Sequence, residues 1–182
     1  MIAALDSDRW FNLQAWTLQQ PYASGIALGA HPARRLDGRW KDVENRPQRR
    51  HLPPEGRWYG LHAGKVFAPW PESDPPWARL LSFVRPVSEP PCGVMLGAFH
   101  VSRCVHYPDP LLIRLLGADV HDPFRLRANP SAFGPWCYLI DRVVLLPEPM
   151  PCRGMNGTWP IARIAGKPVA EAVETAIAGW RS

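Results

Sequence analysis

Proline is the residue type that most restricts the folds open to this chain, because 22 of its 182 residues are proline. A proline fixes its own φ angle and donates no backbone hydrogen bond, so it interrupts helices and central strands. Prolines at this frequency favour many short strands and constrained loops over long helices. Since 46% of the residues are hydrophobic and nine are tryptophan, we expect one folded domain with a sizeable core.

Alternation of apolar and polar residues predicts strands at 13–18, 57–63, 93–101, 136–146 and 158–164. A helix is predicted from Pro21 to just before Gly29, and shorter helices at 77–84 and 110–116. Residues 31–39 and 147–157 are expected to be loops. The clearest helix runs from Pro168 to Trp180, with Val169, Val173, Ala176, Ile177 and Trp180 at helical spacing.

Strands therefore outnumber helices, and short strands with a few peripheral helices suggest a small barrel. Three segments are expected: an N-terminal arm at 1–12, the main domain at 13–164, and a C-terminal amphipathic helix at 165–182 that packs on the domain.

Membrane insertion and secretion are not expected from this sequence. No stretch approaches about 18 consecutive apolar residues, and acidic residues precede the first apolar block. The four cysteines are at positions 92, 104, 137 and 152, and no two of them form a CxxC pair. This spacing argues against a zinc site and favours reduced thiols. A disulfide between two of them remains open. We therefore predict a cytoplasmic monomer with no metal site, no cofactor and no membrane partner.

The positive charge is concentrated in one segment. Residues 31–65 contain nine basic and four acidic residues, so they account for the whole net charge of +5, and the remainder has twelve of each. The aromatic and histidine residues of the same segment include Trp40, Trp58, Tyr59, His51 and His62. Basic residues interleaved with aromatic ones are typical of surfaces that bind single-stranded or flipped-out nucleic acid. An ordinary basic surface is the alternative.

Residues 41–46, with the order Lys-Asp-Val-Glu-Asn-Arg, form the most distinctive motif of this segment. In a strand, Glu44 and Arg46 would share one face. A turn or bulge near the second residue of the motif is needed to bring Lys41 beside Glu44. A solvated edge strand with a surface ion pair is the competing interpretation.

Other short motifs accompany this one in a recognisable order. Residues 18–24 read Leu-Gln-Gln-Pro-Tyr-Ala-Ser, residues 41–46 supply Lys-x-x-Glu-Asn-Arg, and residues 60–65 read Gly-Leu-His-Ala-Gly-Lys. The order resembles the ASCH domain, a branch of the PUA-like superfamily. Segments 93–101, 133–139, 149–154 and 157–161 resemble the family's glycine-rich central strand and its closing segment. The resemblance spans about residues 13–164.

The resemblance implies a mixed α+β, strand-rich fold: a PUA-like β-barrel of five or six strands with flanking helices. It implies a cleft beside the first helix, lined by Lys41, Glu44 and Arg46. The further residues implied near the mouth of this cleft are Ser24, His62 and Lys65. Such domains are associated with RNA or DNA binding, with transcription coactivation and, in some members, with hydrolysis of nucleic acids or modified nucleosides.

Two features depart from the family pattern. The family joins its first helix to the lysine by a residue or two, whereas residues 30–40 form a long basic link here, with Gly38 displaced by one position. Members that resemble an amidohydrolase of acetylated cytidine have a threonine where this chain has Glu44, so that activity is not implied.

The leading prediction is a module that holds RNA, DNA or a modified nucleotide in a basic cleft. Cations would meet phosphate, aromatic rings would stack on a base, and Glu44 would accept from a base amino group. The residues predicted to contribute are Tyr22, Ser24, Trp40, Lys41, Glu44, Arg46, Arg49, Arg50, Trp58, His62 and Lys65. A single strand or a flipped-out base is favoured over an intact duplex.

Two alternatives remain open at this point. One is a hydrolase of the ribonuclease or modified-nucleoside amidohydrolase type, with Lys41 as nucleophile or base, Glu44 positioning it, and Ser24 or His62 completing the site. The other is a protein-interaction module of a transcription-related complex. Binding is favoured because Glu44 and Arg46 are more readily interpreted as a recognition pair. Trp136 and Trp159, in apolar segments, are predicted to lie in the core.

Overall fold

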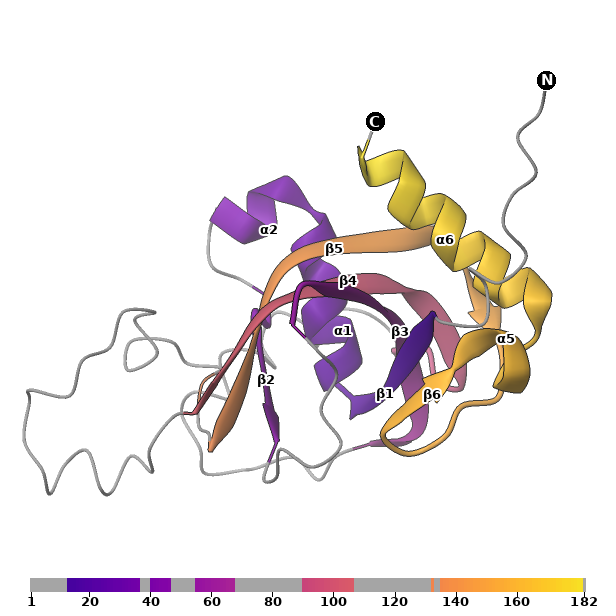
Figure 1. Cartoon of the computed structure of the whole chain (residues 1–182), viewed down its shortest axis with the longest axis horizontal. Coiled ribbons are helices and arrows are strands. Elements are labelled where there is room, and N and C mark those ends of the chain that lie inside the picture. Colours follow the sequence, from indigo (N-terminus) through magenta and orange to yellow (C-terminus); the bar gives the residue numbers. More distant parts are fainter. Residues whose placement is uncertain are drawn as a thin grey trace, which may run out of the picture.

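The structure, a computed structural model, describes residues 13–36, 40–46, 55–67, 90–106, 132 and 135–181. Over these residues the protein is mixed α+β and strand-rich, with one curled six-stranded sheet and a few helices (Figure 1). The predicted arm at 1–12, the predicted helices at 77–84 and 110–116, and the two candidate site residues Arg49 and Arg50 lie outside the described residues.

Six strands form the sheet: β1 (Gln14–Gln20), β2 (Val43–Arg46), β3 (Arg57–Phe67), β4 (Val94–His106), β5 (Trp136–Pro151) and β6 (Thr158–Pro160). Their order across the sheet is β2-β5-β4-β3-β1-β6. Strand β1 runs parallel to β3, and the other neighbouring pairs are antiparallel. The predicted long strand at 136–146 is confirmed and continues to Pro151.

Register shifts between β4 and β5 help the sheet to curl into a half-barrel (Figure 1). One shift falls between Met95 and Gly97. At Gly97 the backbones approach so closely that a Cβ atom would lie 2.0 Å from the carbonyl oxygen of Val144. Only glycine fits such a bulge, and bulges bend the strands that contain them. A small β-barrel is compatible with this curled sheet.

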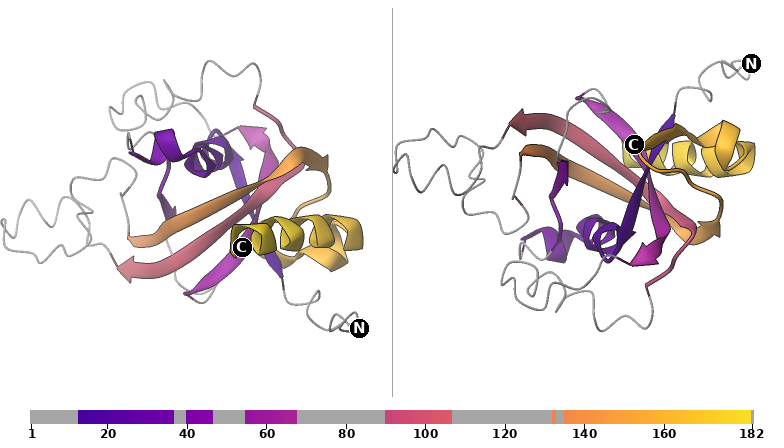
Figure 2. Two further views of the ribbon diagram at one scale, coloured as in Figure 1. Left: turned by 90° about the horizontal axis from the view of Figure 1, so that it is seen from above. Right: turned by 90° about the horizontal axis from the view of Figure 1, so that it is seen from below.

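Helices cover both faces of the sheet (Figure 2). Helix α1 (Tyr22–Ala27) buries Ala23 and Ile26 against the concave face. Helices α5 (Ile161–Ile164) and α6 (Lys167–Arg181) pack against the opposite face. Because adjacent residues of β1 point to opposite faces, Trp16 joins the concave core while Ala15 joins the core beneath α6.

The predicted C-terminal helix is confirmed as α6. Val169, Val173 and Ile177 are buried against the sheet. Trp180, by contrast, is 42% exposed, and the guanidinium of Arg142 lies 4.4 Å from its ring centroid. The apolar residues at helical spacing therefore form the packed face of α6, except for the last of them, Trp180.

Three segments differ from the sequence-based expectation, one of them being the expected loop at 147–157, which belongs to β5 as far as Pro151. The expected loop at 31–39 contains a short helix, α2 (Pro32–Leu36), which follows a 3-10 turn, η2 (Leu28–Ala30). The His31 carbonyl accepts hydrogen bonds from the first turn of α2, and proline at the first helical position favours that conformation. The expected strand at 158–164 ends at Pro160, because helix α5 begins at Ile161, whose N–H still donates to the Leu13 carbonyl at 3.0 Å.

The four cysteines are free thiols. Among the described residues, no helix is long and apolar enough to cross a membrane.

Candidate functional site

Lys41, Glu44 and Arg46 form a continuous chain of charged groups at edge strand β2. The Lys41 ammonium donates to Glu44 Oε2 at 2.7 Å and to the backbone carbonyl of Val43. The other carboxylate oxygen, Glu44 Oε1, lies 3.2 Å from Arg46 Nε. Because Lys41 precedes the first residue of the strand, it escapes the strand alternation and reaches Glu44. The three residues therefore lie together in one chain of contacts.

Burial distinguishes the three side chains, which are 2%, 9% and 28% exposed for Lys41, Glu44 and Arg46. Strand β2 is an edge strand, as the competing interpretation predicted, but the ion pair is inside the protein rather than on a solvated surface. Such a buried pair gains little net stability, because desolvation of both charges offsets most of their attraction. Its evident effect is to hold the Glu44 carboxylate, and through it the arginine, in one position.

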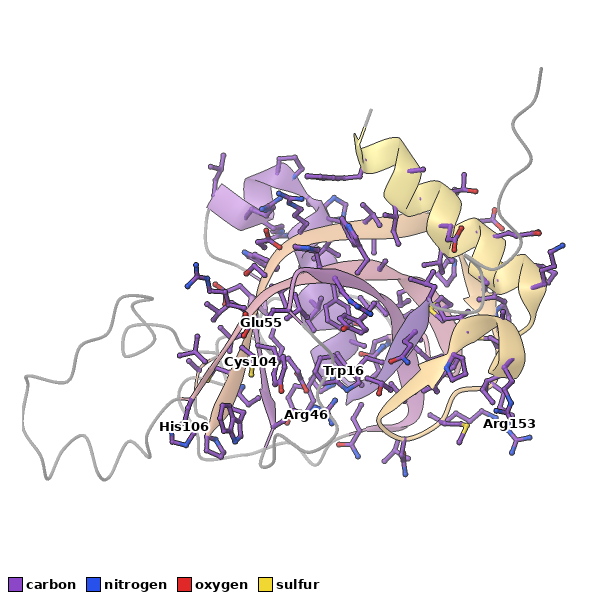
Figure 3. The ribbon with its side chains drawn as sticks, viewed as in Figure 1. Trp16, Arg46, Glu55, Cys104, His106 and Arg153 are labelled. Carbon is purple, nitrogen blue, oxygen red and sulfur yellow. The ribbon has the colours of Figure 1, made fainter. Side chains whose placement is uncertain are left out.

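Arg46 lies against a strand that is far from its own in the sheet. Its guanidinium carbon is 4.6 Å from the ring centroid of Trp16 on β1 (Figure 3). Three strands separate β2 from β1 in the sheet order, so only the curl of the sheet brings these two residues together. Trp16 also packs edge-on against Tyr138 of β5, with centroids 5.3 Å apart. Cation–π attraction and the Glu44 contact together restrain the guanidinium.

Tyr22 and Trp136 lie beside this group. The Tyr22 ring centroid is 5.9 Å from the Lys41 ammonium. Burial raises the pKa of Tyr22, and the nearby Glu44 carboxylate raises it further, so its phenol keeps its proton at neutral pH. Trp136 is the cross-strand partner of Arg46 and is only half-buried at the edge of the core. The prediction that Trp136 is a core residue away from the basic segment holds only in part.

Arg46 is the member of the charged group best able to contact a ligand, because it has the most exposed side chain. Lys41 is buried and spends two of its three N–H donors on protein oxygens. This geometry favours a positioning role for Lys41 over the predicted phosphate contact or nucleophile. Glu44 is likewise occupied on both oxygens.

Among the described residues, the side chains of Ser24 and Trp40 form no hydrogen bond, ion pair or ring contact with the charged group. The backbone N–H of Ser24 donates to the Gln20 side chain at 3.1 Å. Trp40 packs so closely on Gly29 that a Cβ atom there would lie 2.1 Å from its ring, and the Arg35 guanidinium lies 5.7 Å from its centroid. The Trp40 ring was predicted to stack on a base, but in the structure it packs against Gly29 and Arg35.

His62 is on the opposite face of the sheet from Arg46. In β1, Trp16 contacts Arg46, whereas the next residue, Thr17, contacts His62. The Thr17 Oγ1 atom is within hydrogen-bond distance of His62 Nδ1, at 3.1 Å. Adjacent strand residues point to opposite faces, so the sheet separates His62 from the charged group. Lys65, further along β3, lines a pocket together with His62. His62 and Lys65 were expected at the mouth of the cleft that contains Arg46. The structure instead places them at a separate pocket on the other face of the sheet.

Trp58 also faces away from Arg46. It packs in the core beneath α6, with its ring centroid 5.9 Å from that of Trp180 and 5.5 Å from that of His100. The Trp58 ring was predicted to stack on a base. In the structure it packs against the C-terminal helix instead.

A relay of hydrogen bonds connects Trp159, Thr17 and His62. The indole N–H of Trp159 donates to Thr17 Oγ1 at 2.9 Å, which leaves the Thr17 hydroxyl proton free to donate to His62 Nδ1 at 3.1 Å. On the other side of the ring, His62 Nε2 faces the Cys152 carbonyl at 3.4 Å and must donate to it. A neutral ring with its proton on Nε2 satisfies both contacts. Burial lowers its pKa below 6.5, although the hydrogen bond to Cys152 opposes this.

We expect His62 to make the protein less stable in mild acid. Since its pKa is lower in the folded state than the unfolded value of 6.5, the unfolded state binds the proton more strongly. The free energy of unfolding should be at its plateau above pH 6.5 and fall as the pH decreases from 6.5 towards the folded pKa. Urea denaturation between pH 8 and 5 measures this.

The His62→Gln variant should show a weaker acid dependence than the wild type. The control is His31→Gln, because His31 is exposed. Equal pH dependence in wild type and His62→Gln would contradict the assignment.

Sequence reasoning missed Trp16, which it treated as an ordinary strand residue, and Thr17 beside it. No local pattern marks either residue, since their partners come from distant strands. Comparison with protein-family models and with curated proteins found no match to this sequence. The functional inference below therefore depends on the residues themselves.

Proposed function

We propose that this chain is an ASCH-type, PUA-like domain that binds RNA or DNA, in single-stranded or flipped-out form, at the concave face around Arg46. The observation that carries the proposal is the Arg46 guanidinium, which is restrained by Glu44 and Trp16 and still 28% exposed. A guanidinium held in this way loses little freedom on binding a phosphate or a base edge. The order of the sequence motifs and the strand-rich half-barrel are compatible with this proposal.

Electrostatics support an anionic partner. The excess positive charge of the chain lies within residues 31–65, which include Arg46. Within the described part of this segment, Arg35 on α2 and Arg57 at the start of β3 are exposed. Exposed cations of this kind attract a phosphate backbone regardless of its sequence, while a restrained arginine adds geometric selectivity.

The contacts of Lys41 favour binding over hydrolysis. A lysine that acts as nucleophile or base must present an unprotonated amine to its substrate. The Lys41 nitrogen instead donates to the Glu44 carboxylate and the Val43 carbonyl, and its side chain is 2% exposed. Hydrolysis through Lys41 would require this arrangement to open.

Replacement of Arg46 by glutamine should weaken binding of labelled single-stranded RNA or DNA by about 10- to 100-fold, equivalent to ~1.4–3 kcal/mol. Fluorescence anisotropy measures this directly. Arg142→Gln is a matched control: Arg142 also lies over a tryptophan ring, at 4.4 Å, and next to a carboxylate, Asp141, at 3.4 Å. Arg142 packs on α6 at the other face of the sheet, so its loss should leave affinity nearly unchanged.

Binding should also weaken steeply with salt. If about five phosphates of a single strand are neutralised, affinity should fall about a hundredfold between roughly 50 and 200 mM salt. Absence of binding at low salt, or an equal loss of affinity in Arg46→Gln and Arg142→Gln, would show that the proposed site is not the interface.

A further inference from the structure

A pocket of about 770 Å³ opens on the face of the sheet opposite Arg46. It lies where β1 and β3 meet the loop that follows β5, and its lining includes Thr17, His62, Lys65 and Arg153. Figure 3 labels Arg153 at the α5 and β6 end of the molecule, well away from Arg46. The volume is in the range of small-molecule sites, roughly 300–1,000 Å³.

The charge of this pocket is positive and uncompensated. Lys65 and Arg153 line it, and none of the described residues that line it is an aspartate or glutamate. Within the described part of the chain, neither cation forms an ion pair with a carboxylate. The backbone amides of residues 153–156 donate to no acceptor among the described residues. Two cations beside free amides are the chemistry of a site for a doubly charged anion.

Close packing and hydrogen bonds hold the wall of the pocket around His62 and Thr17 in one conformation. Gly154 packs against the His62 ring so closely that a Cβ atom would lie 2.3 Å from Cε1. Thr17, His62 and Trp159 are joined by the relay of hydrogen bonds described above. Gly93, on the other side, has a φ of +67° that favours glycine. The pocket is therefore formed by backbone and buried side chains, with the two long cations at its opening.

The mouth of the pocket is also apolar. Met155, which lines it, is 50% exposed. The other exposed large hydrophobic residues of the described part, Leu36, Val66 and Trp180, do not line the pocket. An exposed apolar side chain beside two cations suits a ligand that has both an anionic group and an apolar or planar body.

We propose that this pocket binds a small phosphate monoester with a planar organic part, of the nucleoside monophosphate class, with Lys65 and Arg153 on the phosphate and Met155 against the planar part. A phosphate monoester has a charge of about −1.5 to −2 at neutral pH, which matches the two cations. The site goes beyond the nucleic-acid function proposed above and is independent of it, because the two sites lie on opposite faces of the sheet.

Isothermal titration calorimetry with three probes tests the proposal: inorganic phosphate, uridine 5′-monophosphate and uridine. Uridine 5′-monophosphate should bind at least tenfold more tightly than either phosphate or uridine alone, because it satisfies both parts of the site. If inorganic phosphate binds as tightly as the monophosphate, the pocket is a site for free phosphate only, and the proposal is overturned. In the NMR spectrum of the wild-type protein, the amide signals of Gly64, Gly93 and Gly154 should shift on addition of the monophosphate.

Lys65→Gln and Arg153→Gln should each weaken monophosphate binding about tenfold without a change in melting temperature, because both side chains are exposed. Arg163→Gln on α5 is the control for loss of an exposed arginine outside the pocket, and it should keep wild-type affinity. Failure of the monophosphate to bind, unshifted glycine signals, or an equal loss in this control would overturn the proposal. None of these outcomes depends on nucleic-acid binding.

Discussion

Replacement of Trp159 by alanine should lower the free energy of unfolding by about 3–5 kcal/mol, the cost of a large cavity in a core. Trp159 is 2% exposed, and it packs in the core between β1 and the C-terminal helix. Its ring is 5.5 Å from that of His62, and its indole N–H is the donor to Thr17. Because domains of this size are stable by only about 5–15 kcal/mol, the loss should be evident in urea denaturation.

Trp159→Phe separates the cavity from the hydrogen bond. The phenyl ring fills most of the space but donates no hydrogen bond, so Thr17 loses its donor and stability should fall by only about 1–2 kcal/mol. If Trp159→Ala melted cooperatively at the wild-type midpoint, Trp159 would not be the core residue that its burial indicates.

Replacement of Lys41 by methionine should cost about 3 kcal/mol, because it leaves the Glu44 carboxylate buried with one partner fewer. The estimate is at the lower end for a broken buried pair, since Arg46 still lies 3.2 Å from Glu44. Urea denaturation of the single variant measures the effect.

The double variant Lys41→Met with Glu44→Met should recover most of this stability, to within about 1 kcal/mol of the wild type, because both buried charges are then removed. Binding of single-stranded nucleic acid should nevertheless weaken, since Arg46 has lost the carboxylate that restrains it. A double variant that bound as tightly as the wild type would show that the ion pair has no positioning role. One that lost the summed stability of the two single variants would show that the pair itself is strongly stabilising.

Local patterns in the sequence were sufficient to predict most of the regular elements. Alternation identified β1, β3, β4 and β5, and helical spacing identified α6, because each of these elements buries one face or both within its own length. The boundaries were less accurate. Strand β6 ends at Pro160 because helix α5 begins at the next residue, and β5 extends to Pro151 because β4 pairs with it as far as Val94. Both limits depend on a neighbouring element.

Part of the candidate site was also predicted from local order. The sequence predicted that Lys41, Glu44 and Arg46 lie together, and the structure places them in contact, although the pairing of β2 with β5 has no register shift. Their burial was not predictable, because an edge strand with alternating charges is usually solvated. The side chains that enclose the pair come from other elements, among them Tyr22 on α1.

The sequence by itself determined most of the strands and helices and which short motif carries the charged group. Only the tertiary structure decided which motifs share a face. The curl of the sheet places Arg46 on Trp16 although three strands separate them, and the pleat of β1 directs Thr17, and with it His62, to the other side. The physical reason is that side-chain alternation has a period of two along one strand, whereas the curvature of a sheet depends on bulges and pairings among residues distant in the chain.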